Sequence, residues 1–262
     1  MGKIRQTLND LKIQGKKAFI PYLTFGYPDV ATFEKTLLAL DSLEGVSIIE
    51  VGLPFSDPVA DGPVIQQSSA AALANGVNLQ QYCSVLKKIK PGLKSPLILM
   101  TYYNLVFGAG MAHFMDLISG IIDGLIIPDI LPEDAVELRK EAAAGNIDMT
   151  FFLSPTSAPE RIKLVDRAST GFVYYVSVTG TTGARESFSD TVYSQIKKTY
   201  SKLNSPLCAG FGISTAEHVN KFNSVSDGVI VGSAFIRRMV QCDNKSKIPH
   251  QIREYAQCLI KG

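Results

Sequence analysis

Eight short apolar segments, rich in β-branched and aromatic residues, recur along the chain. Several are apolar almost throughout rather than alternating, which is typical of parallel strands buried on both faces. No Pro- or Ser-rich linker separates them. The pattern therefore predicts eight strands in one sheet, at Ala18–Thr24, Ser47–Leu53, Pro96–Tyr102, Gly124–Asp129, Met149–Ser154, Gly171–Ser177, Pro206–Gly212 and Gly228–Gly232.

Amphipathic stretches lie between these predicted strands. Phe33, Leu37 and Leu40, for example, fall on one face of a helix. A strand–helix alternation repeated eight times predicts an α/β fold, a single (β/α)8 TIM barrel domain that spans residues 1–262. An open doubly wound sheet is the alternative that the pattern leaves open.

The first 14 or so residues predict an additional N-terminal helix. Ile4, Leu8 and Leu11 share one face of it. This apolar face precedes the first predicted strand, so we expect the helix to cover the bottom of the barrel.

Three segments carry the local signals of a helix start. Leu131–Asp134 places a proline and two acids in a first turn. Ser157–Glu160 and Ser214–Glu217 both have the spacing of a capping box. We expect a helix to begin at each of them.

The composition excludes several classes of protein. Hydrophobic residues make up 46% and charged residues 19% of the chain, which excludes intrinsic disorder. Lysine and arginine number 26 against 24 acidic residues, so no broad positive surface for nucleic acid or an anionic membrane is expected. No apolar stretch is long enough to span a bilayer. The four cysteines form no metal-binding pattern, and with no apolar signal segment we expect a cytoplasmic protein.

Two predicted loops are unusually long for a compact barrel. One runs from Pro54 to about Asn75 after the second strand, and the other from Val178 to about Asp190 after the sixth. Active residues of such barrels sit at the carboxyl ends of the strands and on the loops that follow. We expect both loops to be mobile and to meet over the barrel mouth.

Glu50 and Asp61 are the candidate catalytic residues. Glu50 lies inside an apolar strand, where desolvation raises the pKa of a carboxyl group toward neutrality. A buried structural ion pair is the alternative for Glu50, and a simple turn is the alternative for Asp61. Because the segment with Asp61 leaves the strand that holds Glu50, we expect the two carboxylates to share a pocket and to divide acid, base and electrostatic roles.

Two glycine turns follow the last two predicted strands. Gly212 belongs to the first, and Gly232 and Ser233 to the second. Glycine lets the backbone approach a ligand closely, and the seventh and eighth loops of this fold often hold phosphate. Gly180–Gly183 offers further amides after the sixth strand. Tight turns without a ligand are the alternative.

Aromatic residues gather near the ends of the strands. Tyr22, Tyr102 and Tyr174 are candidates for the wall of a flat pocket that binds an aromatic ligand. The histidines fall in helical or C-terminal stretches, where a role in catalysis is not expected.

Several segments together resemble the signature of tryptophan synthase alpha subunits. The longest match is Ile49–Gln66, which contains both candidate carboxylates and is specific to that family. The other matches follow in chain order through most of the sequence, at Pro21–Gly26, Met100–Asn104, Ala209–Thr215 and Asp227–Ser233.

The resemblance implies a lyase that splits indole-3-glycerol phosphate into indole and glyceraldehyde 3-phosphate, with no cofactor in this chain. It implies that Glu50 is the general acid and base, and that Asp61 binds the indole N–H. It also implies a beta subunit partner that carries pyridoxal phosphate, receives the indole and forms an alpha-beta-beta-alpha tetramer. The remaining matches imply that Tyr174 lines the site, Thr182 contacts Asp61, and phosphate is bound by Gly183, Gly212, Gly232 and Ser233.

The segment after the sixth strand departs from the family. It reads Ser177–Gly183 as SVTGTTG, with Val178 where the family usually has arginine and Thr181 where it has valine. This departure keeps a second function open, an alpha-like subunit that mainly binds and activates a beta subunit. A different phosphate-binding barrel enzyme is a third possibility, which the long signature does not favour.

Overall fold

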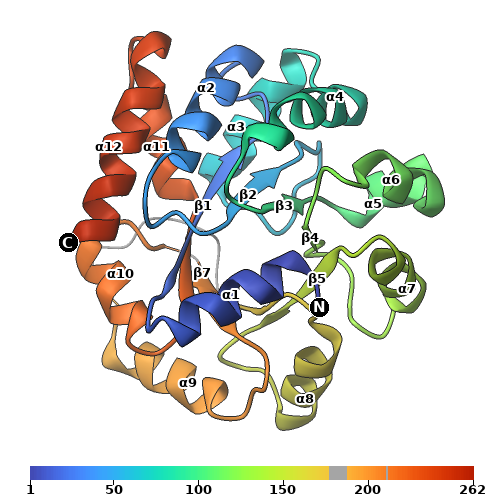
Figure 1. The fold of residues 1–262 in the computed structure, drawn as a ribbon, viewed down its shortest axis with the longest axis vertical. Coiled ribbons are helices and arrows are strands. Elements are labelled where there is room, and N and C mark those ends of the chain that lie inside the picture. The colour runs from blue at the N-terminus through green and yellow to red at the C-terminus, as the bar shows by residue number, and fades with distance from the viewer. Residues whose placement is uncertain (177–187, 211) are drawn as a thin grey trace.

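The computed structural model describes residues 1–176, 188–210 and 212–262. Its eight parallel strands form a closed barrel (Figure 1). The barrel closes where β1 pairs with β8, as in Ala18 opposite Gly228. This closure confirms the (β/α)8 barrel and is incompatible with an open doubly wound sheet. The strands are β1 (Ala18–Thr24), β2 (Ile49–Gly52), β3 (Leu97–Met100), β4 (Gly124–Ile126), β5 (Asp148–Leu153), β6 (Val173–Val176), β7 (Leu207–Gly210) and β8 (Gly228–Val231).

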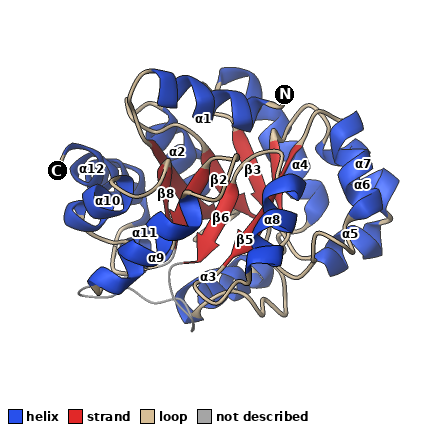
Figure 2. Cartoon of the chain, turned by 90° about the horizontal axis from the view of Figure 1, so that it is seen from below, coloured by secondary structure: helices blue, strands red, loops and turns tan. Residues whose placement is uncertain are grey.

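Helices surround the barrel and cover the outer faces of the strands (Figure 2). Within the described residues, no helix is long and apolar enough to cross a membrane. The α-helices are α1 (Lys3–Ile13), α2 (Val30–Asp41), α3 (Pro63–Ala74), α4 (Leu79–Ile89), α5 (Tyr103–Ala109), α6 (Met111–Ile118), α7 (Val136–Ala144), α8 (Pro159–Ala168), α9 (Asp190–Tyr200), α10 (Ala216–Asn223), α11 (Ser233–Val240) and α12 (Ile248–Lys261), with short 3-10 turns at Lys90–Gly92 and Lys245–Lys247.

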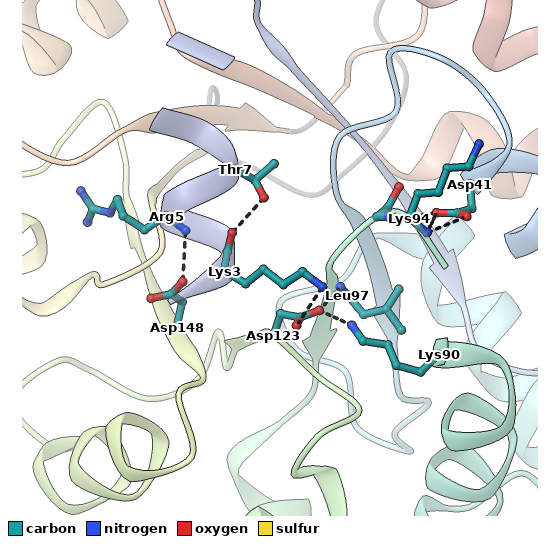
Figure 3. Close-up of polar contacts among 10 residues, drawn as sticks. Lys3, Arg5, Thr7, Asp41, Lys90, Lys94, Leu97, Asp123 and Asp148 are labelled. Carbon is teal, nitrogen blue, oxygen red and sulfur yellow. Dashed lines mark hydrogen bonds and ion pairs between the residues drawn. The ribbon is translucent and has the colours of Figure 1, made fainter. Parts of the chain in front are cut away.

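Helix α1 lies across the end of the barrel where the strands begin, as the sequence predicted (Figures 1 and 2). Ile4 and Leu8 are buried and pack on the residues that fill the barrel interior. The backbone N–H of Arg5 donates to the Asp148 carboxylate at 3.1 Å, and Lys3 pairs with Asp123 (Figure 3). Apolar packing and polar contacts together hold α1 as a cover for this end.

An aspartate in the last turn of a helix holds the segment before a strand in both halves of the barrel. At the end of α2, the Asp41 carboxylate accepts the Lys94 amide before β3 (Figure 3). It also accepts the Ser95 amide. In α8, Asp166 accepts the amides of Asn204 and Ser205 before β7. Both segments that donate these amides continue as Ser-Pro-Leu.

A second pair of aspartates, each just before the next strand, accepts the first amide of the same two strands, β3 and β7. Asp123, before β4, accepts the Leu97 amide at 2.8 Å, and Asp227, before β8, accepts the Leu207 amide at 2.9 Å. Each aspartate is followed by glycine. Strands β3 and β7 are therefore anchored by equivalent carboxylates, so the two four-stranded halves of the barrel share one hydrogen-bonding arrangement.

We expect the substitution Asp166→Ala to destabilise the barrel by about 2 kcal/mol, because it leaves the buried Ser205 amide and the partly buried Asn204 amide without their acceptor. Burial alone would raise the pKa of Asp166, but hydrogen bonds from Ser205 and Asn204 hold that pKa below its ordinary value. The contribution is therefore present at neutral pH and is lost as pH falls through the folded-state pKa. Urea unfolding at pH 7 measures it, with the exposed Asp116→Ala as control. Equal stability of the two variants would contradict this role.

The prediction of a long loop from Pro54 to Asn75 is wrong for its second part, because helix α3 begins at Pro63. Proline at the first helical position and the extended N-cap residue Gly62 favour this start. The buried face of α3 is made largely of Ser68, Ser69 and Ala72 rather than large apolar residues, so it carries little helical hydrophobic periodicity. Only residues 53–62 connect β2 to the helix.

Three expected helix starts are also displaced. Leu131–Asp134 forms a turn, and α7 begins only at Val136. The Ser157 hydroxyl accepts the Ser154 amide at 2.9 Å and caps no helix. At α10 the cap is Thr215, whose hydroxyl accepts the His218 amide at 3.1 Å. A proline in a turn gave the false signal at Leu131–Asp134, whereas Ser157 and Ser214 each lie one residue before the actual N-cap.

Candidate active site

A cavity lies at the carboxyl ends of the strands, opposite α1. It combines both candidate carboxylates with most of the other residues predicted from the sequence. Thr182 and Gly183, together with Val178 and Thr181, lie outside the described residues. The cavity is lined by Tyr22, Glu50, Asp61, Ile65, Met100, Tyr174, Gly212, Ile230, Gly232 and Ser233.

Glu50 extends from the middle of β2, opposite Tyr22 of β1 and Ile98 of β3. Its side chain is only 1% exposed. Among the described residues, its Oε2 atom has no hydrogen-bond partner. Burial, and secondarily the charge of Asp61, raise the pKa of Glu50 to about 8. Glu50 therefore holds a proton at neutral pH and can donate it into the cavity.

Asp61 lies on the segment that connects β2 to α3. Burial raises its pKa to about 6, and a hydrogen bond from Tyr102 opposes part of that rise. The Tyr102 hydroxyl donates to Asp61 Oδ2 at 2.9 Å. Asp61 is therefore mostly ionised at neutral pH while Glu50 is protonated. Two carboxyl groups with separated pKa values in one cavity can act as a proton donor and as a stabiliser of positive charge.

Tyr22 and Tyr174 form part of the cavity wall. Gly52 and Gly210 make room for them, because a Cβ atom at either glycine would overlap a tyrosine hydroxyl. The ring of Tyr174 packs on Phe152 with centroids 4.8 Å apart. With Ile65, Met100 and Ile230 nearby, these rings give the cavity an apolar side suited to a flat aromatic group.

The glycine turns lie on another part of the cavity wall. Gly212 has φ of +78°, a conformation that favours glycine, and Gly232 immediately precedes α11, which begins at Ser233. No lysine or arginine is among the described residues that line the cavity. The backbone amides of the two turns are therefore the available donors for an anionic group.

Some lining residues were not predicted from the sequence. Met100 and Ile230 follow the alternation of inward-facing positions on β3 and β8, and that pattern could have indicated them. Ile65 belongs to the helix that the sequence reading missed. Tyr102 was expected to bind substrate, but it contacts Asp61 instead of lining the cavity. Within the described part of the chain, no group of side chains is arranged to hold a metal ion.

Comparison with known proteins gives the family. A family model described as tryptophan synthase alpha chain matches residues 8–261. A tryptophan synthase alpha chain from Geotalea uraniireducens is 43% identical over 238 residues, covering 90% of this chain and 89% of the relative. The alpha chain of Arabidopsis thaliana is 41% identical over 250 residues, covering 95% and 89%.

Solved structures agree with this assignment. In a tryptophan synthase structure from Mycobacterium tuberculosis, a chain superposes with a TM-score of 0.88 at 30% identity, covering 100% of this chain and 99% of that one. A chain of the tryptophan synthase α2β2 complex of Pyrococcus furiosus gives a TM-score of 0.85 at 36% identity, covering 92% and 97%. The sequence match spans nearly the whole chain and includes the strand that carries Glu50 and the turn that carries Asp61, so this protein belongs to the tryptophan synthase alpha chain family.

Proposed function

We propose that this chain is the alpha subunit of a tryptophan synthase and cleaves indole-3-glycerol phosphate to indole and glyceraldehyde 3-phosphate. The observation that carries the proposal is that the carboxyl groups of Glu50 and Asp61 line one cavity, where burial raises the pKa of Glu50 to about 8 and that of Asp61 only to about 6. The apolar wall suits the indole ring, and the turns at Gly212 and Gly232 suit the phosphate. Gly183 would add an amide there by its resemblance to the family.

The proposed reaction is a retro-aldol cleavage. Protonated Glu50 gives its proton to indole C3, and the Asp61 carboxylate accepts a hydrogen bond from the indole N–H and stabilises the positive charge on the ring. The Glu50 carboxylate then takes the proton of the hydroxyl on the adjacent glycerol carbon. As that carbon becomes an aldehyde, its bond to C3 breaks and the electron pair restores the aromatic ring. Glu50 ends protonated, so the cycle needs no cofactor in this chain.

The proposed partner is a beta subunit that carries pyridoxal phosphate and receives the indole in an alpha-beta-beta-alpha assembly. Three exposed apolar side chains follow consecutive strands at the barrel mouth: Val59, Phe107 and Leu131, with exposed fractions of 80%, 72% and 51%. Each of these side chains follows the carboxyl end of its strand, the end of the barrel that bears the cavity and from which indole would leave. We place the beta subunit on this surface and the complex in the cytoplasm.

Phe107→Asp should weaken binding to the beta subunit at least tenfold, because it places a charge where an aromatic anchor is expected. Isothermal titration of the chain with its beta subunit measures the effect. Val240→Asp is the matched control, since Val240 is also exposed but lies at the opposite end of α11 from the mouth. Equal affinities for the two variants would remove α5 from the interface.

The direct test is release of indole from indole-3-glycerol phosphate, measured with and without the beta subunit. The proposed lyase releases indole in both conditions. A chain that only activates its partner would release none while still increasing the rate of tryptophan formation from added indole and serine. No observation favours this second function.

A further inference from the structure

Both hydrogen-bonding functions of the Tyr102 hydroxyl are used within the protein. The O–H donates to Asp61 Oδ2 at 2.9 Å, and the oxygen accepts the Ala60 backbone N–H at 3.1 Å. A tyrosine hydroxyl offers one proton and accepts readily at its oxygen, so both contacts are satisfied at once. The side chain is 2% exposed. The hydroxyl is therefore committed to the Asp61 segment rather than to a substrate.

The ring of Tyr102 holds the same segment at a second point. It stacks on Phe55 with centroids 5.2 Å apart and planes inclined by 26°. Phe55 lies near the beginning of the β2–α3 connection, and Ala60 and Asp61 lie near its end. Tyr102 itself sits between β3 and α5, where the barrel fixes its backbone. One side chain at the start of α5 thus contacts both ends of the connection.

Apart from Tyr102, the titratable groups around the Asp61 carboxylate do not favour its ionised form. The titratable groups that act on it or feel its charge are Glu50 from β2, Tyr22 from β1, Tyr174 from β6 and Tyr102. None of these is a cation, and no described lysine or arginine lines the cavity. The backbone of Asp61 is held by its own bonds, from its N–H to the Pro58 carbonyl and from the Gln66 side chain to its carbonyl. These bonds do not reach the carboxylate.

We propose that Tyr102 is the positioning residue for Asp61: its hydroxyl and its ring together fix the carboxylate over the cavity. The kinetic part of this inference rests on the proposed lyase activity, whereas the contact itself does not. Tyr102 acts through Asp61 and touches no reacting atom.

The test is Tyr102→Phe, which removes both hydrogen bonds and keeps the ring that stacks on Phe55. Tyr103→Phe is the matched control, because it removes a hydroxyl from the next residue of the same helix start. The Asp61 carboxyl carbon is titrated by NMR in carbon-13-labelled protein, with its signal assigned by its loss in Asp61→Asn. We expect the pKa of Asp61 to rise by about one unit in Tyr102→Phe and to stay unchanged in Tyr103→Phe.

The kinetic readout is the pH profile of kcat/KM for indole release. In Tyr102→Phe the acid limb of the profile, which reports ionisation of Asp61, should move to higher pH by the same amount. The alkaline limb, which reports Glu50, should stay where it is. At pH 7, kcat should fall several-fold. The loss should disappear in an Asp61→Asn background, where no carboxylate remains to position. If Tyr102 only stabilised the fold, its replacement would lower activity at every pH and leave both limbs of the pH profile at the same pH values.

The outcomes separate the two proposals. An unchanged Asp61 titration in Tyr102→Phe, or an equal loss of activity in the Asp61→Asn background, overturns the role of Tyr102. Absence of indole release by the unaltered chain overturns the proposed lyase, and the NMR titration still decides the role of Tyr102.

Discussion

Glu50→Gln should lose most of the lyase activity, with indole release reduced by about 10²- to 10⁴-fold. Glutamine keeps the size of the side chain but can neither give a proton to indole C3 nor take one from the glycerol hydroxyl. The apolar wall and the glycine turns remain, so KM should change little. Single-turnover indole release at pH 7 measures the effect, and near-normal release would remove Glu50 from the mechanism.

The Glu50→Gln variant also tests the raised pKa of Glu50, through the pH dependence of the unfolding free energy. The folded chain keeps the Glu50 proton up to about pH 8, whereas the unfolded chain loses it near its ordinary value of 4.5. The stability that Glu50 contributes is therefore complete below pH 4.5 and is lost progressively as pH rises to about 8. Glu50→Gln has no such proton, so its unfolding free energy relative to the parent chain should rise over that range. A constant difference between the two in urea unfolding would contradict burial of the carboxyl group.

Asp61→Asn should reduce kcat by about 10²- to 10³-fold, comparable to the loss of one preorganised group that stabilises transition-state charge. The backbone bonds of residue 61 and the stacking of Tyr102 on Phe55 remain, so the β2–α3 connection should keep its position. What is lost is the negative charge beside the indole nitrogen. Steady-state kinetics at pH 7 should show the loss in kcat.

Asp57→Asn is the control for Asp61→Asn. Asp57 lies in the same connection and carries the same charge, but it is exposed and its carboxylate accepts from the neighbouring Ser56 hydroxyl. Its replacement should leave kcat close to that of the parent chain. If both variants lost activity equally, the general charge of the segment would matter rather than the position of Asp61.

The activity of the parent chain should depend on pH, because burial raises the pKa values of Glu50 and Asp61 to different extents. Glu50 has no described partner at Oε2, so desolvation is nearly unopposed. Asp61 has the Tyr102 hydrogen bond, which favours its charged form. Activity should require Asp61 ionised and Glu50 protonated, which gives a bell-shaped profile with limbs near pH 6 and pH 8.

The sequence by itself determined an α/β fold with eight covered parallel strands. Apolar runs such as Ala18–Thr24 are typical of parallel strands buried on both faces, and eight of them with intervening helices favour a barrel. The pairing of β1 with β8 in the tertiary structure decided that the sheet closes. The sequence also indicated Glu50, because a carboxyl group within such a run has few structural explanations. Gly212 and Gly232 were indicated by their position after the last two strands. These signals are local, and each depends on residue type and spacing alone.

Only the tertiary structure decided how distant segments meet. Tyr102 and Asp61 are 41 positions apart, and their contact depends on where β3 lies beside the β2–α3 connection once the barrel closes. The start of α3 was hidden because its buried face is small and polar and packs only against its particular neighbours. The anchoring of Ser95 by Asp41 likewise joins residues that no local pattern relates. Local periodicity reports which face of an element is buried, whereas a hydrogen bond between elements requires their relative placement, and that is set by packing of the whole chain.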